Sequence, residues 1–337
     1  MPYALENELK QQILIDSMSR ADIVHDGDIT FYADVQQWNY RNKMEYSFFG
    51  NDDGLHLALF NRGTHQKQIV TGSSLARPEI DTVANKVCEV LQKNNVRASD
   101  LKSVVIRCNQ AGDSVVALYV RNQEFMQIPE LETTAKGLVV TYSNPKSPAS
   151  VRTQDLYKFG DISLTDELLE KPISYDVFSF FQGNVPAFTK TLRRIAEVTK
   201  ESSVIDMFSG VGAIGLSLPK ADILVESDAN NVVWARKNTG VERSAEVVHA
   251  TSERALEYVD DQHILIVDPP RAGLHKDLVD RIIDVKPPKI VYLSCNPSTQ
   301  ARDLATLQDA YHIKEITGYN YFPRTPHIES LAILMRK

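Results

Sequence analysis

The chain has 337 residues, of which 43% are hydrophobic and 24% are charged. This composition predicts a globular protein of about two domains that needs neither metals nor disulfides to support its core. No apolar run approaches the roughly 18 residues needed to cross a bilayer, and no signal segment opens the chain, so we expect a cytoplasmic protein without a membrane partner. The formal net charge of −7 argues against a protein that coats nucleic acid indiscriminately, because such binding depends on neutralising phosphates.

Residues 1–172 are predicted to form an N-terminal α+β region. Apolar spacing predicts helices at 5–17 and 80–92, and alternating or continuous apolar runs predict strands at 29–32, 40–49, 55–60, 104–108 and 115–120. The stretch 144–150 concentrates proline and serine, which predicts a loop close to a domain seam. Residues 173–337 are expected to form the second domain.

The strand predicted at 40–49 mixes aromatic residues with the cations Arg41 and Lys43. Aromatic rings beside cations suit base stacking and phosphate contact, so this segment is a candidate RNA surface. The alternative is that the rings fill a β core, as β-strand aromatics commonly do: Tyr40, Tyr46, Phe48 and Phe49. Arg41 and Lys43 are the stronger RNA candidates.

From residue 203 onward, predicted strands and helices alternate. The strands lie near 203, 222, 246, 263, 290, 312 and 329. Such alternation predicts an α/β fold, with a parallel sheet covered by helices on both faces.

A glycine-rich turn follows the first of these strands. The segment 204–215 runs from an apolar strand into a Gly-x-Gly-x-x-Gly turn and then, we expect, a helix. Gly210 and Gly212 would let a cofactor approach the backbone closely. Glycines alone fit a nicotinamide enzyme, a flavoprotein or a methyltransferase, but the next strand ends in Glu226, a carboxylate suited to ribose hydroxyls. A nucleotide-like ligand is therefore predicted.

Two further strands end in chemically capable residues. Asp268-Pro-Pro-Arg271 places a carboxylate and a rigid turn at the carboxyl edge of the sheet, as in the substrate-side motif of methyltransferases that use S-adenosylmethionine. Cys295 lies between an apolar strand and a helix that Asn296 caps and Pro297 begins. The amino end of that helix predicts a thiol pKa below the ordinary value of about 8.5. The alternative is that Cys295 is a small buried hydrophobe.

Four motifs together carry a resemblance to a known family. They start at Asp206, Asp268, Ser294 and Thr325, and read Asp-Met-Phe-Ser-Gly-Val-Gly, Asp-Pro-Pro-Arg-Ala-Gly, Ser-Cys-Asn-Pro and Thr-Pro-His-Ile-Glu. In this order they resemble the RNA uracil-C5 methyltransferases, which make 5-methyluridine in tRNA and ribosomal RNA. The resemblance is strongest from about residue 179 to the C-terminus and weaker at 40–46.

The resemblance implies a Rossmann-like domain whose last strand is antiparallel, and S-adenosylmethionine as the cofactor. In this family a Phe-x-Gln-x-Asn segment contacts the methionine part of the cofactor, which carries that role to Gln182; the alternative is an amide that caps the helix predicted at 185–200. The implied cofactor residues are Gln182, Phe208, Gly210, Gly212, Glu226 and Asp268. Two departures are Phe208 and Ala213, where relatives can have tyrosine and asparagine. The segment 247–253 also lacks the aspartate that often recognises adenine, so no adenine ligand is assigned.

The resemblance also implies the chemistry. Cys295 would add to uracil carbon 6 and Glu329 would remove the proton from carbon 5, although an isolated glutamate at a strand start is ordinarily a salt-bridge partner. Arg271 would face a phosphate or the developing enolate, and His327 either orients Glu329 or packs structurally.

Two features of some relatives, an iron–sulfur cluster and an accessory RNA-binding barrel, are expected to be missing from this chain, and their absence guides the expected substrate. The three cysteines, Cys88, Cys108 and Cys295, cannot supply the four ligands of the iron–sulfur cluster found in some relatives, and we expect no metal. The accessory barrel of many relatives is also expected to be missing, which favours tRNA, at its T-loop uridine, over ribosomal RNA. We expect a monomer. The remaining alternatives are a ribosomal RNA enzyme, an amino-group methyltransferase with an inert Cys295, a cytosine-C5 enzyme and a non-catalytic RNA-binding factor.

Overall fold

The computed structural model describes residues 1–61, 63–64, 66–147, 149–200, 202–240 and 245–337. They form two compact units: unit 1 contains residues 1–37, 167–174 and 179–337, and unit 2 contains residues 38–166 and 175–178. This division differs from the predicted boundary between 172 and 173, because residues 1–37 pack with the C-terminal half of the chain. The predicted loop at 144–150 falls inside unit 2 as turns and bends, with position 148 outside the described residues.

Unit 1 is built on an eight-stranded sheet in the order β1-β16-β17-β15-β14-β11-β12-β13. Neighbouring strands pair in parallel except at β17, which runs antiparallel to both β15 and β16. The predicted α/β class and the antiparallel last strand are therefore confirmed. The strands are β1 (Thr30–Ala33), β11 (Val204–Asp206), β12 (Ala221–Glu226), β13 (Glu246–His249), β14 (Ile264–Val267), β15 (Lys289–Ser294), β16 (Tyr311–Asn320) and β17 (Glu329–Arg336).

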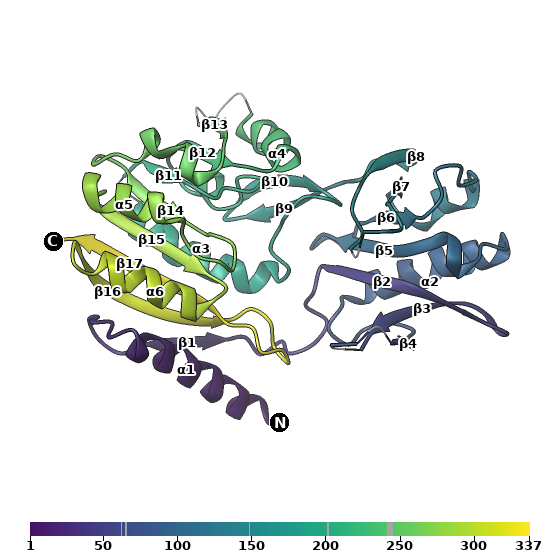
Figure 1. Cartoon of the computed structure of the whole chain (residues 1–337), viewed down its shortest axis with the longest axis horizontal. Helices are drawn as coiled ribbons and strands as arrows, with labels where there is room; N and C mark the ends of the chain where they lie inside the picture. The colour runs from purple at the N-terminus through teal and green to yellow at the C-terminus, as the bar shows by residue number, and fades with distance from the viewer. Residues whose placement is uncertain (62, 65, 148, 201, 241–244) are drawn as a thin grey trace. The chain divides into compact units, whose positions relative to one another are not determined.

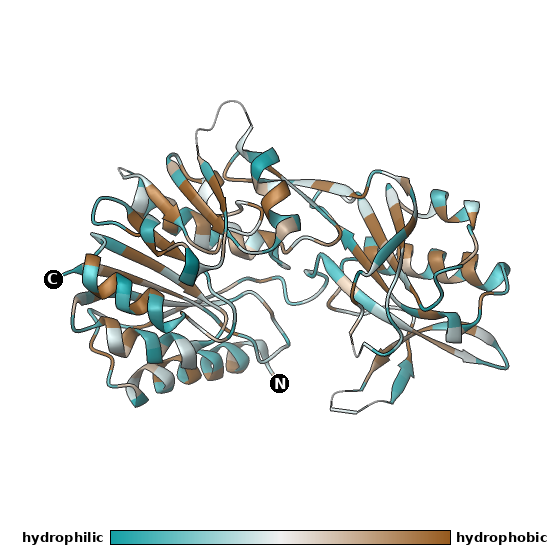
Figure 2. Cartoon of the chain, turned by 45° about the horizontal axis from the view of Figure 1, so that its top comes forward, coloured by the Kyte–Doolittle hydropathy of each residue, from teal (hydrophilic) through white to brown (hydrophobic). Residues whose placement is uncertain are grey.

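The helices of unit 1 cover this sheet. They are α1 (Tyr3–Arg20), α3 (Val185–Thr199), α4 (Ala229–Thr239), α5 (Lys276–Val285) and α6 (Pro297–Leu307), with short 3₁₀ turns η3 (Gly215–Ser217), η4 (Ser252–Arg254) and η5 (Leu256–Tyr258). Buried side chains of α1, α5 and α6 share one hydrophobic core with the central strands, for example Leu14, Leu278 and Leu304. In Figure 2 the strands of this sheet carry much of the hydrophobic colour, while the helices alternate between hydrophobic and hydrophilic.

Residues 1–37 belong to the same unit as the C-terminal half of the chain because they pair and pack with it. β1 pairs in parallel with β16, with Thr30 opposite Thr317, and α1 packs against α6 and β16. Figure 1 shows these first elements, in purple, beside the yellow C-terminal strands. Apolar spacing predicts that such elements exist, but their partners are set by contacts far away in the sequence.

The glycine-rich turn corrects one prediction, because the expected helix after it is only the 3₁₀ turn η3. The amide of Gly215 donates to the carboxylate of Asp206 at 2.8 Å instead of extending a helix. Pro219 follows closely, and it has no N–H with which to continue helical hydrogen bonding.

Unit 2 is a seven-stranded sheet in the order β4-β3-β2-β5-β6-β7-β8. The long helix α2 (Pro78–Lys93) and the inner face of the sheet share one core. The other elements are β2 (Lys43–Asn51), β3 (Gly54–Phe60), β4 (Lys67–Ile69), η1 (Ala98–Asp100), β5 (Leu101–Cys108), β6 (Ser114–Val120), η2 (Pro129–Thr134), β7 (Gly137–Tyr142) and β8 (Gln154–Gly160). A separate two-stranded sheet, β9 (Ser163–Leu168) with β10 (Lys171–Asp176), has residues in both units.

Candidate active site

The predicted site residues of the second half gather at one edge of the unit 1 sheet. β11 ends at Asp206 and β12 at Glu226, while Asp268 and Cys295 come directly after β14 and β15. β17 runs in the opposite direction, so it brings its first residue, Glu329, to this same edge. Carboxyl ends of parallel strands are where open α/β sheets bind ligands.

Strand register places Cys295 beside Glu329. Ser294, the last residue of β15, lies opposite Ser330 of β17, so the next residue on β15 faces the preceding residue on β17. Cys295 itself is a bend residue just past the paired ladder, and the charge of Glu329 raises its pKa, which indicates that the two groups are near each other. A thiol and a carboxyl group therefore lie near each other at this edge.

The turn that carries Cys295 is held by the start of α6. Asn296 is the N-cap, as predicted, and its side-chain oxygen accepts from the amide of Ser298 at 3.2 Å. Its amide nitrogen donates to the carbonyl of Arg271 at 3.0 Å, and the hydroxyl of Thr299 donates to that carbonyl at 3.1 Å. The cysteine turn and the Asp-Pro-Pro-Arg turn are thus joined.

The pKa of Cys295 corrects the prediction from the helix end. Burial raises the pKa of this thiol, and the neighbouring carboxylates Glu329 and Asp268 raise it further, whereas Arg271 opposes them. The prediction considered only the helix terminus and omitted desolvation and negative charge, which come from residues distant in the sequence.

The two carboxyl groups beside the cysteine are held toward their neutral forms. Burial, with Asp268 as the second cause, raises the pKa of Glu329 well above its ordinary value, and Arg271 again opposes the rise. Burial and the charge of Asp206 raise the pKa of Asp268 to about 7. Arg271 is therefore the cation that favours charge on both Cys295 and Glu329.

Asp206 is a residue to which the sequence prediction gave no role. It is fully buried, and burial raises its pKa to about 7, with the charge of Glu226 adding to the rise and the amide of Gly215 opposing it. Its position at the head of the glycine motif was the one signal in the sequence.

Gln182 lies close to Asp268, with its amide nitrogen 3.5 Å from a carboxylate oxygen of Asp268. The alternative role as helix cap falls to Asn184, which accepts from the amide of Ala187 at 3.3 Å. Gln182 is thus at the ligand edge, beside a second predicted cofactor residue.

The glycine turn leaves open space next to its backbone at Gly210. Gly210 and Gly212 both have positive φ, at 56° and 87°, and a side chain at Gly210 would meet no atom within 4 Å. The amide of Gly210 donates to Glu226 at 2.8 Å, so the predicted ribose carboxylate also braces this turn. Phe208 packs its partly buried ring against the core.

Two buried polar atoms in this region lack hydrogen-bond partners in the described part of the chain: one carboxylate oxygen of Asp206 and the hydroxyl of Ser209. Buried polar groups are ordinarily satisfied, so such atoms point to a polar ligand. The open space at Gly210 and the carboxylate of Glu226 fit S-adenosylmethionine, whose ribose carries hydroxyls.

His327 lies beside Arg271, with its Nδ1 atom 3.2 Å from the guanidinium. Its ring also meets Phe322 edge to face, with centroids 5.9 Å apart. His327 thus lies next to Arg271, the arginine that lowers the pKa of Cys295 and of Glu329.

Arg41 and Lys43, the predicted RNA contacts, belong to unit 2 and so are not in the compact unit that holds Cys295. Lys43 lies opposite Arg107 in the pairing of β2 with β5, and burial together with that arginine lowers its pKa to about 8. Among the neighbouring aromatics, Tyr46 and Phe48 are core residues, as the alternative reading had it, while Phe49 is 38% exposed.

Within the described ranges, no group of three or more His, Cys, Asp or Glu side chains could hold a metal ion. None of the helices in those ranges combines the length and the apolar character that crossing a bilayer requires.

Comparison with known proteins points to the RNA methyltransferases. Residues 251–337, which include Asp268, Cys295 and Glu329, match the model of the tRNA (uracil-5-)-methyltransferase family. A Lactobacillus johnsonii protein named as an uncharacterized RNA methyltransferase is 28% identical over 99% of this chain and 80% of its own, and one from Enterococcus faecalis is 28% identical over 89% and 72%. The crystal structure of a Pyrococcus abyssi tRNA (uracil-54, C5)-methyltransferase with S-adenosyl-L-homocysteine superposes with a TM-score of 0.84 at 23% identity, covering 99% of this chain and 84% of that one.

The fold is that of the Rossmann-like methyltransferases that depend on S-adenosylmethionine. The matched motifs narrow the class. Over residues 251–337 the chain is similar to the tRNA (uracil-5-)-methyltransferase family, and its relatives over the whole length are named as RNA methyltransferases.

Proposed function

We propose that this protein methylates carbon 5 of a uracil in RNA, with Cys295 as the nucleophile and Glu329 as the base. The observation that supports the proposal is the register of β15 and β17, which pairs Ser294 with Ser330 and so brings the adjoining residues Cys295 and Glu329 to the same end of the two strands. The match of residues 251–337 to the family supports uracil as the reacting base.

Uracil needs covalent activation because its two carbonyls withdraw electron density from carbon 5. The thiolate of Cys295 bonds to carbon 6, and the electron pair of the ring double bond moves onto the oxygen of carbon 4 as an enolate. As the carbon 4 carbonyl re-forms, carbon 5 would bond to the methyl group that S-adenosylmethionine supplies when bound, and the S–CH3 bond would break to leave S-adenosylhomocysteine. Glu329 then accepts the carbon 5 proton, the double bond re-forms, and Cys295 leaves carbon 6 as a thiolate.

Arg271 supports both halves of this sequence. Its positive charge favours the thiolate that attacks and the carboxylate that later takes the proton, since it lowers the pKa of both groups. Asp268 and burial act in the opposite direction, which keeps the thiol and the carboxyl toward their neutral forms. We propose that Arg271 also meets an RNA phosphate or the enolate oxygen.

The remaining assignments extend the proposal. Six residues at the sheet edge would hold the cofactor: Gln182, Phe208, Gly210, Gly212, Glu226 and Asp268. Arg41 and Lys43 of unit 2 would contact RNA, and the T-loop uridine of tRNA is the proposed target. The protein would act as a monomer in the cytoplasm.

The test compares Cys295→Ala with Glu329→Gln, because the two residues act at opposite ends of the reaction. Cys295→Ala should form no covalent RNA adduct and lose turnover. Glu329→Gln should add, accept the methyl group and then stall, because a neutral amide cannot take the proton. A methylated protein–RNA adduct should then persist through denaturing electrophoresis. Cys88→Ala is a matched control, since burial raises the pKa of that thiol to about 11 and it lies in unit 2.

Mass spectrometry of the product nucleosides identifies the methylated atom. A normal rate in Cys295→Ala would refute the covalent mechanism and favour an amino-group methyltransferase. A tRNA T-arm and ribosomal RNA fragments should be compared as substrates; methylation of the ribosomal fragments alone would refute the proposed tRNA target.

A further inference from the structure

The first helix carries a buried pair of opposite charges. Glu6 and Lys10 of α1 are only 9% and 4% exposed. A glutamate and a lysine four residues apart on a helix ordinarily lie in solvent, where their pairing stabilises the helix only slightly. Their burial here requires partners that compensate for lost hydration.

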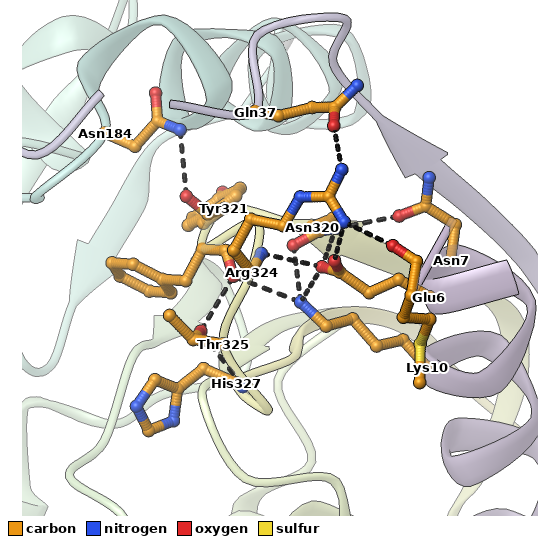
Figure 3. A network of polar contacts seen from close by, with 12 residues as sticks. Glu6, Asn7, Lys10, Gln37, Asn184, Asn320, Tyr321, Arg324, Thr325 and His327 are labelled. Atoms are coloured by element: carbon orange, nitrogen blue, oxygen red, sulfur yellow. Dashed lines mark hydrogen bonds and ion pairs between the residues drawn. The ribbon is translucent and has the colours of Figure 1, made fainter. Parts of the chain in front are cut away.

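Those partners lie in the loop of residues 321–328 and at the end of β16, which precedes it. The ammonium of Lys10 donates to the side-chain oxygen of Asn320 at 2.7 Å and to the carbonyl of Phe322 at 3.1 Å, and it pairs with Glu6 at 3.1 Å (Figure 3). An ammonium has three donors, so its capacity is filled. Glu6 in turn accepts from the amide of Arg324 at 2.9 Å and from Asn320 at 3.3 Å.

The loop has an unfavourable backbone conformation at Arg324, whose φ is +64°. For a residue other than glycine this region is sterically unfavourable. Contacts with the N-terminal segment offset that cost: the guanidinium donates to the carbonyl of Met1 at 2.8 Å, hydrogen bonds to Gln37, and lies 5.3 Å from the ring centroid of Tyr3. Figure 3 shows Glu6 and Gln37 converging on Arg324.

From the loop, hydrogen bonds lead toward the site. The carbonyl of Phe322, which accepts from Lys10, also accepts from the hydroxyl of Thr325 at 2.7 Å. The amide of His327 donates to that hydroxyl at 3.4 Å. Glu329 follows two residues later as the first residue of β17.

A second anchor comes from the cofactor side of the site. The side-chain amide of Asn184 donates to the carbonyl of Tyr321 at 2.8 Å, and Asn184 also caps α3, two residues after Gln182. The loop is thus held by α1 at one point and by the start of α3 at another.

We propose that α1 is a positioning element for catalysis, in which Glu6 and Lys10 hold the loop 321–328 so that His327 lies at Arg271 and Glu329 lies at Cys295. This inference rests on the proposed role of Glu329 as the base. A buried ion pair contributes little net stability compared with apolar residues of the same volume, but it can specify one arrangement. Glu6 and Lys10 touch no reacting atom; they act through the loop.

The double variant Glu6→Gln/Lys10→Met tests this role, because removing one partner alone would leave an uncompensated buried charge. It should lower kcat about 10-fold, since small misplacements of reacting groups are costly. The methylated RNA adduct should accumulate, as in Glu329→Gln, while S-adenosylmethionine affinity stays within about twofold of wild type. The control is Asp26→Asn/Lys314→Met, which removes an exposed ion pair of 2.8 Å in the same unit and should leave all three quantities unchanged.

The adduct fraction separates positioning from loss of folded protein. Fewer folded molecules would reduce adduct and product together, whereas misplaced Glu329 raises the ratio of adduct to product. Wild-type kcat and adduct ratio in the double variant would overturn the inference.

If the double variant fails to fold, Arg324→Gly provides a second test of whether the N-terminal segment positions the loop. Glycine adopts the positive φ without strain, but the guanidinium contacts with the N-terminal segment are lost. It should also raise the adduct ratio, and a wild-type ratio would overturn the inference. If the wild type itself forms neither adduct nor 5-methyluridine, the proposed function fails first.

Discussion

Replacing Asp206 with asparagine should flatten the dependence of folding stability on pH. The pKa of Asp206 is about 7 in the folded protein, against about 3.9 in an unfolded chain. A difference of about three pH units corresponds to about 4 kcal/mol. Because the folded pKa is the higher one, the folded state favours the neutral carboxyl. Asp206 therefore makes its full contribution to the free energy of unfolding below about pH 4, and that contribution is lost as the pH rises through 7. Asparagine cannot ionise and retains an oxygen to accept from Gly215.

Urea unfolding at pH 4.5 and at pH 8.5 measures this effect. Between these two pH values, the free energy of unfolding of the wild type should fall by about 3 kcal/mol more than that of Asp206→Asn. Asp268 and Glu329 also have raised pKa values and contribute to the fall in both proteins, but Asp268 contributes less in Asp206→Asn, because the charge of Asp206 no longer raises its pKa. Asp28→Asn, at an exposed position, should match wild type. Parallel stability curves for wild type and Asp206→Asn would show that Asp206 does not titrate in this range.

The glycine turn and its carboxylate give two further predictions. Gly212→Ala should lower the free energy of unfolding by about 2 to 4 kcal/mol, measured by thermal unfolding, because its φ is +87° and the new Cβ would lie 2.5 Å from a methyl carbon of Leu216. Gly210→Ala meets no atom within 4 Å, so it should lower that free energy by only about 1 to 2 kcal/mol and should instead weaken S-adenosylmethionine binding. A larger loss of stability in Gly210→Ala than in Gly212→Ala would contradict the proposed site. Glu226→Gln should weaken cofactor binding in calorimetry by about 1 to 3 kcal/mol through loss of a charged hydrogen bond. Unchanged affinity would remove Glu226 from the site.

Local features of the chain were predictable from the sequence because their causes are local. Alternating apolar segments predicted the parallel sheet from residue 203 onward, and Asn296 with Pro297 predicted the start of α6. The motif carboxylates were expected at strand ends, and Glu226 and Asp268 lie there. The glycine turn was found as well, but the helix expected after it was not, since Gly215 turned its amide to Asp206.

Pairings between distant segments could not be read in the same way. Nothing in residues 5–17 indicates that Glu6 and Lys10 face inward, because their spacing is also that of a solvated pair on a helix surface. Their burial depends on the loop after β16, more than 300 positions away in the chain. The predicted boundary at 172 failed to group residues 1–37 with the C-terminal half for the same reason.

The sequence by itself determined the elements, the motifs and the residue types that the chemistry requires. Only the tertiary structure decided that Cys295 and Glu329 adjoin the same strand pair, Ser294 with Ser330, because a strand's register depends on pairing along its whole length. It also decided the protonation of the site: burial and the carboxylates gathered from β14 and β17 raise the pKa of Cys295, against the lowering expected from its helix. Desolvation is a property of three-dimensional packing, and no local pattern of residues encodes it.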